Sequence, residues 1–124
     1  MTPRSTQVVP STDGVRLALH HLGGDGPVVL VCHATGFHGR AYRPLADPLS
    51  AEYSVWALDF RGHGASSAPV SGDFTWDGMA ADLLAVVDAI GVDGVLGVGH
   101  SLGGAALLLA ELARPGVLRA GFLF

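Results

Sequence analysis

Three short apolar runs dominate the pattern of this sequence. Val28–Cys32, residues 53–58 and residues 94–98 contain mainly aliphatic and aromatic side chains, and glycine, proline or polar residues flank each run. Apolar runs of this length without polar alternation are typical of strands buried on both faces, as in a parallel sheet. We therefore expect three neighbouring parallel strands, and residues 118–124 to begin a fourth.

Helical patterns lie between and after these runs. Thr75 can cap a helix that continues to Ile90 and ends at Gly91, with apolar residues at helical spacing. Residues 102–113 predict a strongly apolar helix, and residues 41–49 a short one with Pro44 in its first turn. Alternation of strand and helix favours a mostly parallel sheet with helices on both faces.

The start of the chain predicts a different element. Residues 7–9 and 15–22 flank the turn at residues 12–14, which indicates an antiparallel hairpin at the edge of the sheet. On such a strand we expect His20 and His21 to be exposed to solvent on one side. The fold class is therefore α/β, with residues 1–124 forming part of a single domain.

Composition restricts the partners. Hydrophobic residues make up 49% of the chain and charged residues 15%, which predicts a buried core. A net charge of −4 argues against nucleic acid or an anionic membrane as partner. The longest apolar run, residues 105–110, is much shorter than the roughly 20 residues of a membrane span. Without a signal-peptide pattern in residues 1–10, we expect a cytoplasmic protein with a small-molecule substrate.

The residue types also limit the chemistry. All basic residues are arginine, so lysine-based catalysis has no candidate within these residues. The single cysteine, Cys32, excludes an internal disulfide and is expected to fill apolar space. Together with His33 and His38 it does not form a convincing metal-ligand set. We expect neither a metal nor a cofactor.

The segment Gly99-His-Ser-Leu-Gly103 carries the strongest functional signal. It lies where the third apolar strand meets the apolar helix, an arrangement that lifts the Ser101 hydroxyl above the edge of a sheet. Gly99 and Gly103 would permit close approach of strand and helix. The helix N-terminus would direct the Leu102 N–H towards a developing oxyanion.

Two other interpretations of this segment are open. A glycine-rich turn could serve packing alone, although packing would not require a serine. A dinucleotide-binding turn would begin with Gly97 and Gly99, but Leu102 occupies its third glycine position. Glu111 also follows the turn too closely to bind a ribose.

Three motifs together resemble the α/β-hydrolase family, and the resemblance covers nearly all of the chain. His33-Ala-Thr-Gly-Phe37 is similar to the family's His-Gly oxyanion loop, with Ala34 where many members have glycine. Residues 59–66 are similar to its Arg-Gly-x-Gly-x-Ser loop, and residues 99–103 to its nucleophile motif. Each motif follows one of the three buried strands, in the family order.

The resemblance implies roles for individual residues. Ser101 would be the catalytic nucleophile, and the backbone N–H groups of Thr35 and Leu102 would form the oxyanion hole. Phe37 or His38 could instead face the site. His33 and His100 would support the site without acting as the base. Members with Asp in place of Ser101 form alkyl-enzyme intermediates, whereas serine indicates acyl transfer through an acyl-enzyme.

For several other residues we expect a structural role. We expect Arg61 and His63 to hold their loop together, with Asp59 as the partner. Asp59 as a triad acid is disfavoured because it follows the wrong strand. Phe60, Trp56 and Trp76 are expected in the core.

The family order places the triad acid and histidine after the nucleophile. Only 23 residues follow Ser101, and none is His, Asp or Cys. We therefore expect a fragment of a longer hydrolase, truncated after the nucleophile helix and the next strand and inactive alone. Its last apolar strand could pair with another copy. The alternatives are a non-catalytic binding module on the same fold and a degenerate gene product.

Overall fold

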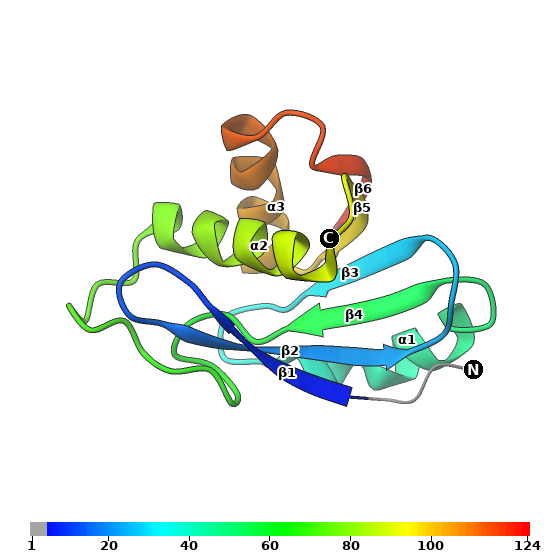
Figure 1. Cartoon of the computed structure of the whole chain (residues 1–124), viewed down its shortest axis with the longest axis horizontal. Helices are drawn as coiled ribbons and strands as arrows, with labels where there is room; N and C mark the ends of the chain where they lie inside the picture. The colour runs from blue at the N-terminus through cyan, green and yellow to red at the C-terminus, as the bar shows by residue number, and fades with distance from the viewer. Residues whose placement is uncertain (1–4) are drawn as a thin grey trace.

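The computed structural model describes residues 5–124 as a six-stranded sheet in the order β1-β2-β4-β3-β5-β6. Helices α2 and α3 cover one face, and α1 lies on the other (Figure 1). The elements are β1 (Ser5–Pro10), β2 (Arg16–Gly23), β3 (Val28–Cys32), the 3-10 helix η1 (Gly39–Tyr42), α1 (Arg43–Leu49), β4 (Ser54–Leu58), α2 (Trp76–Ile90), β5 (Val95–Gly99), α3 (Leu102–Ala113) and β6 (Leu118–Leu123).

The expected parallel strands are confirmed. Strand β3 pairs in parallel with both β4 and β5, and β5 pairs in parallel with β6. The carboxyl ends of β3, β4 and β5 therefore meet at one edge of the sheet, where open α/β sheets place their ligands. None of the helices in residues 5–124 combines the length and apolar character that crossing a membrane requires.

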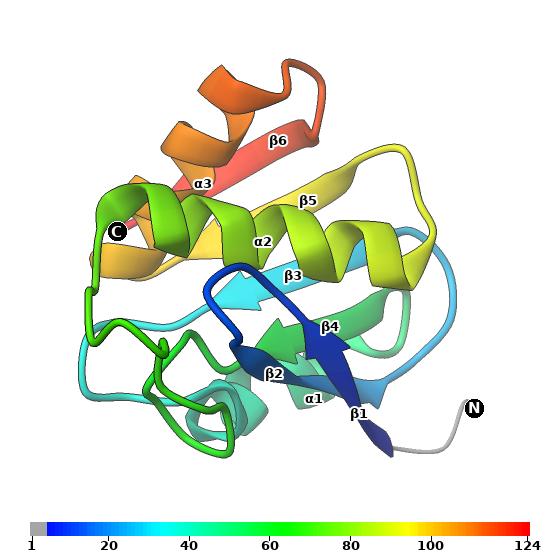
Figure 2. The same cartoon turned by 60° about the vertical axis from the view of Figure 1, so that its left-hand side comes forward.

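Strand β3 separates two apolar layers. Leu30 and Cys32 pack towards α2 and α3, while Val29 and Val31 pack on the opposite face, where Ala46 of α1 lies. Side chains alternate between the faces because successive residues of a strand point in opposite directions. Figure 2 shows α3 beside β5 and β6, with α2 crossing towards the hairpin. The result is a mixed, mostly parallel sheet with helices on both faces.

The hairpin forms as expected, but its strands lie differently in the sheet. Asp13 and Gly14 both have positive φ, at 55° and 69°, which fits the tight turn between the strands. Of the two hairpin strands, only β1 lies at the edge of the sheet, because β2 pairs with both β1 and β4. The expected exposure of His20 and His21 is therefore wrong. Their exposed fractions are 3% and 4%.

Helix α2 has the expected ends. The Thr75 hydroxyl accepts a hydrogen bond from the Gly78 N–H at 3.2 Å, and Gly91 ends the helix with a φ of 83°. Phe60 is fully buried, and Trp56 is partly buried against the core. Trp76 was expected in the core but is 53% exposed. It is the first residue of α2, before the buried residues of the helix begin at Gly78.

A buried ion pair joins three segments of the chain. Arg61 Nη2 lies 2.8 Å from Asp82 Oδ1, and both side chains are at most 2% exposed. The same guanidinium donates to Thr12 Oγ1 at 2.8 Å, and Ser11 Oγ donates to Asp82. The expected partner of Arg61 was Asp59, which is wrong. The pair connects the loop after β4, helix α2 and the hairpin turn.

Asp59 has a different set of partners at the end of β4. It accepts hydrogen bonds from the N–H groups of Gly39 and Ala65 at 2.7 and 3.0 Å, and His20 Nε2 lies 3.0 Å away. Burial raises the pKa of Asp59, but the bonds from His20, Ala65 and Gly39 outweigh it and leave a pKa of about 2. The ionised carboxylate thus fixes the loops that follow β3 and β4.

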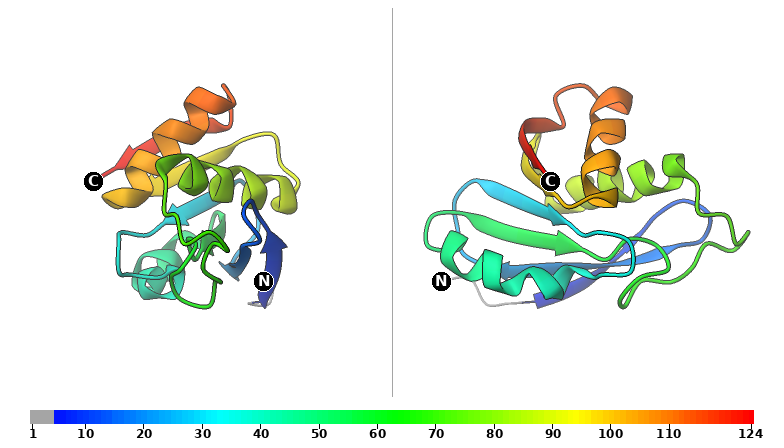
Figure 3. Two further views of the ribbon diagram at one scale, coloured as in Figure 1. Left: turned by 90° about the vertical axis from the view of Figure 1, so that its left-hand side faces the viewer. Right: turned by 180° about the vertical axis from the view of Figure 1, so that it is seen from behind.

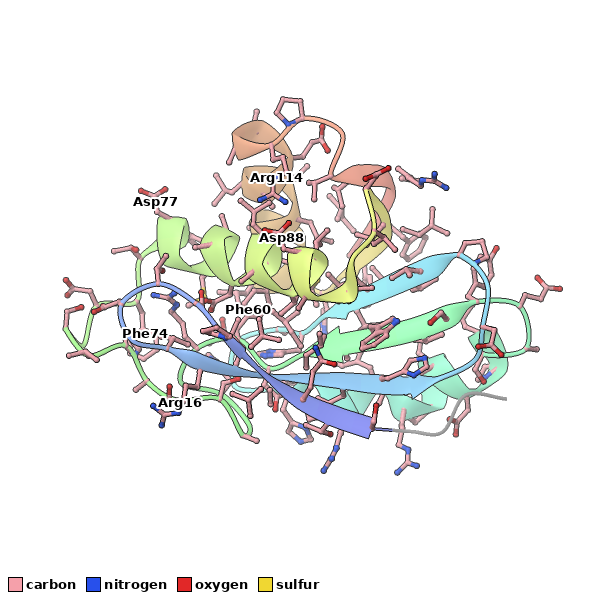
Figure 4. The ribbon with its side chains drawn as sticks, in the orientation of Figure 1. Arg16, Phe60, Phe74, Asp77, Asp88 and Arg114 are labelled. Carbon is pink, nitrogen blue, oxygen red and sulfur yellow. The ribbon has the colours of Figure 1, made fainter. Side chains whose placement is uncertain are left out.

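Loss of one member of the Arg61–Asp82 pair leaves an uncompensated buried charge. Asp82→Ala should therefore lower the free energy of unfolding by about 3–5 kcal/mol, measured by urea denaturation. The control is Asp88→Ala, which breaks the exposed pair with Arg114 (Figure 4). This variant should lose far less stability. Equal losses in the two variants would contradict the assigned role.

The depressed pKa of Asp59 makes its contribution to stability depend on pH. The contribution is fully present above the ordinary aspartate pKa of about 3.9 and disappears as the pH falls towards 2. The difference in unfolding free energy between wild type and Asp59→Asn should shrink over that window. Asp93→Asn, at an exposed carboxylate, controls for general effects of acid. A difference that does not change with pH would count against this assignment.

Candidate active site

Ser101 occupies the bend between β5 and α3. Its φ of 52° and ψ of −108° place a non-glycine residue in a backbone region that costs about 1–3 kcal/mol. The residue is exposed, at the edge where the parallel strands end. The structure thus places the serine as the sequence predicts, on a strained turn between strand and helix.

The flanking glycines allow α3 to approach the sheet. A Cβ atom on Gly103 would lie 2.0 Å from the Cys32 carbonyl oxygen, and one on Gly99 would lie 2.6 Å from the Cα of Gly104. Neither contact is sterically possible, and both involve backbone atoms that cannot move aside easily. Glycine at these two positions is therefore required by the packing of α3 against β3 and β5.

Backbone hydrogen bonds hold the bend in place. The His100 N–H donates to the Cys32 carbonyl at 3.0 Å, and the Ser101 N–H donates to the Phe124 carbonyl at 2.7 Å. The N–H of Ser101 is thus occupied. Leu102 is the first residue of α3, where an N–H has no acceptor within the helix. This N–H is the one that can meet an oxyanion beside Ser101.

The loop after β3 contains the second predicted oxyanion donor. A turn closes between the Ala34 carbonyl and the Phe37 N–H at 3.0 Å, with Gly36 at a φ of 81°. Thr35 is exposed on this turn, whereas Ala34 beneath it is buried. No backbone hydrogen bond among residues 5–124 engages the Thr35 N–H. Phe37 and His38 are exposed on the same loop.

His33 is fully buried and joins two loops. Its Nδ1 donates to the Ala34 carbonyl at 2.7 Å, and its Nε2 accepts from the Phe60 N–H at 2.9 Å. Burial lowers the pKa of His33, which keeps the imidazole neutral in this tautomer at neutral pH. The ring therefore orients the loop after β3 relative to the loop after β4.

Tyr42 connects this loop to the bend at Ser101. Its hydroxyl accepts from the Ala34 N–H at 3.2 Å and donates to His100 Nδ1 at 2.7 Å. His100 in turn stacks on Phe124, with ring centroids 4.8 Å apart. Sequence reasoning missed Tyr42, because nothing in the pattern of a short helix indicates which side chain reaches the neighbouring loop.

The described residues place no general base beside the Ser101 hydroxyl. No histidine or carboxylate of residues 5–124 is hydrogen-bonded to the Ser101 hydroxyl, and His100 is engaged with Tyr42. Cys32 is fully buried, which raises its thiol pKa and makes it a poor nucleophile. Within the same part of the chain, no group of three or more ionisable side chains is placed to bind a metal ion.

Comparison with known proteins agrees with this geometry. The chain is 37% identical over 91 residues to the magnesium-chelatase 30 kDa subunit of Rhodobacter capsulatus, covering 73% of this chain and 32% of that protein. It is 35% identical over 116 residues to an epoxide hydrolase of Caballeronia sordidicola, covering 90% of this chain and 34% of that hydrolase. The chain therefore spans about a third of the length of these curated relatives.

A solved structure provides a similar match. The esterase RhEst1 from Rhodococcus sp. ECU1013 superimposes with a TM-score of 0.86 and 30% identity, covering 96% of this chain and 45% of the esterase. A sequence model of the family described as alpha/beta hydrolase fold matches residues 27–120. With the strand order and the strained bend at Ser101, this match establishes that the chain belongs to the alpha/beta hydrolase fold family.

Proposed function

We propose that this chain carries the nucleophile of a serine hydrolase that forms an acyl-enzyme on a small ester, thioester or activated carbonyl compound. The observation that carries the proposal is the backbone of Ser101, with a φ of 52° on an exposed turn between β5 and α3. Such strain persists only where the surrounding structure enforces it, and it concentrates at functional sites.

The residue type favours acyl transfer. The relatives and structural neighbours include proteins named as an epoxide hydrolase and an esterase, so family membership alone leaves the reaction open. Members with aspartate at the nucleophile position form alkyl-enzymes, and this chain has serine there. A serine hydroxyl adds to a carbonyl carbon and is released again by hydrolysis, which supports the esterase type of reaction.

The chemistry proceeds in two stages. Ser101 Oγ forms a bond to the carbonyl carbon and gives up its proton to a base, while the carbonyl electron pair moves onto oxygen. The N–H groups of Leu102 and Thr35 stabilise that oxyanion. Collapse breaks the bond to the leaving group, which takes the proton, and water then hydrolyses the acyl-enzyme. The base and its orienting acid are assigned to a histidine and a carboxylate of the whole protein beyond the described residues.

Ser101→Ala tests the proposal in the full-length protein. Removal of the nucleophile should lower kcat on p-nitrophenyl acetate at least about a thousandfold and abolish labelling by a fluorophosphonate at this position. Ser50→Ala, at the C-terminal end of α1, should retain activity. The 124-residue chain alone should show no Ser101-dependent turnover. Undiminished activity in Ser101→Ala would favour a non-catalytic module on the same fold.

Tyr42→Phe tests whether the hydroxyl of Tyr42 positions the oxyanion loop. The variant keeps the ring but removes the link between the Ala34 N–H and His100, so kcat should fall about tenfold. KM should change much less, because the variant keeps the interactions that bind the substrate equally in the ground state and the transition state. Tyr53→Phe, whose ring packs against the core, serves as the matched control. An equal fall in both variants would indicate a merely structural role.

A further inference from the structure

A polar hollow lies beside the hairpin strands, on the face of the sheet that carries α1. It has a volume of about 290 Å³, and its lining includes Thr6, His20, Arg40 and Arg43. His21, which also contributes, is paired with Trp56 at the centre of β4. The hollow therefore lies on the β1–β2 side of the sheet, and β4 and β3 separate β2 from β5, the strand that leads to Ser101. Figure 3 shows α1 across this side of the hairpin strands.

The hollow is positively charged, although the chain as a whole carries a net charge of −4. Arg40 and Arg43 are both exposed, and among the residues that the structure describes no carboxylate lines the space between them. Within that same part of the chain, neither guanidinium forms a salt bridge. Two unpaired guanidinium groups around a concave space favour an anionic ligand.

A chain of hydrogen bonds holds the wall of this hollow. Asp59, ionised because of its pKa of about 2, accepts from His20 Nε2 at 3.0 Å. The other ring nitrogen, Nδ1, then accepts from the Thr6 hydroxyl at 2.9 Å. Thr6 Oγ1 in turn accepts from Arg40 Nη2 at 3.0 Å. A buried, ionised carboxylate thus fixes the position of an exposed guanidinium through two intermediate side chains.

We propose that this hollow binds the phosphate group of a small soluble phosphomonoester between Arg40 and Arg43. Only one N–H of Arg40 is used by Thr6, which leaves the remaining donors of its planar fork for phosphate oxygens. A guanidinium held in place before binding loses little entropy when the ligand arrives. The volume is near the lower end of the range for small-ligand sites, which leaves room for a short organic group beside the phosphate.

Calorimetric titration of the full-length protein tests this site. Inorganic phosphate and glycerol 3-phosphate are titrated separately at constant ionic strength. We expect saturable binding of both at one site, with glycerol 3-phosphate binding more tightly. Arg40→Gln and Arg43→Gln should each raise the Kd at least about tenfold, because each removes charge-assisted hydrogen bonds to phosphate.

Arg16→Gln is the matched control, since it removes the same charge from an exposed arginine near the hairpin turn (Figure 4). It should leave both Kd values unchanged. Circular dichroism verifies the fold of each variant, and Thr6→Val replaces any variant that fails to fold. Absence of saturable binding, unchanged affinity in the Arg40 and Arg43 variants, or equal weakening by Arg16→Gln would overturn the proposal. Binding of inorganic phosphate without glycerol 3-phosphate would also overturn it.

Discussion

The contact between the backbone of α3 and the end of β3 is the constraint on which the site depends. Gly103 lies so close to the Cys32 carbonyl that no side chain fits between them. Because the helix starts this close to the sheet, the chain must turn sharply after Gly99, and Ser101 takes up the positive φ that results. The exposed hydroxyl and the first N–H of the helix are consequences of that close approach.

The loops around Ser101 are held by polar groups that the sheet buries. Asp59 fastens the loops after β3 and β4, and His33 bridges the same two loops from within the core. Tyr42 then connects the loop after β3 to His100, which precedes Ser101 at the bend. Directional hydrogen bonds fix loop geometry more closely than apolar contacts do, because they favour a narrow range of distances and angles.

The sequence predicts the framework well, because the framework follows from local patterns. Apolar runs identify the parallel strands, Thr75 and Gly91 mark the ends of α2, and the glycines around Ser101 indicate the tight bend. Partners distant in the sequence follow no such pattern. In the sequence, Asp59 and Asp82 are both acidic residues that could pair with Arg61. Only the packing of α2 places Asp82 beside Arg61.

The histidines of β2 illustrate the same limit. Alternation in residues 15–22 indicates a strand but does not reveal that β4 pairs on its other side, and that pairing buries His20 and His21. The roles of Thr35 and Leu102 as oxyanion donors stay predictions. The Tyr42 link is likewise a matter of tertiary placement, because residues 34, 42 and 100 meet only in the folded chain.

Cys32 gives the protein an internal reporter. Its thiol is the single one in the chain and is fully buried where α3 begins against the sheet. A thiol reagent can reach the sulfur only while the helix is lifted away, so the rate of modification measures how often this junction opens. The rigidity of the structure beneath Ser101 can therefore be measured in solution without introducing a cysteine by mutation.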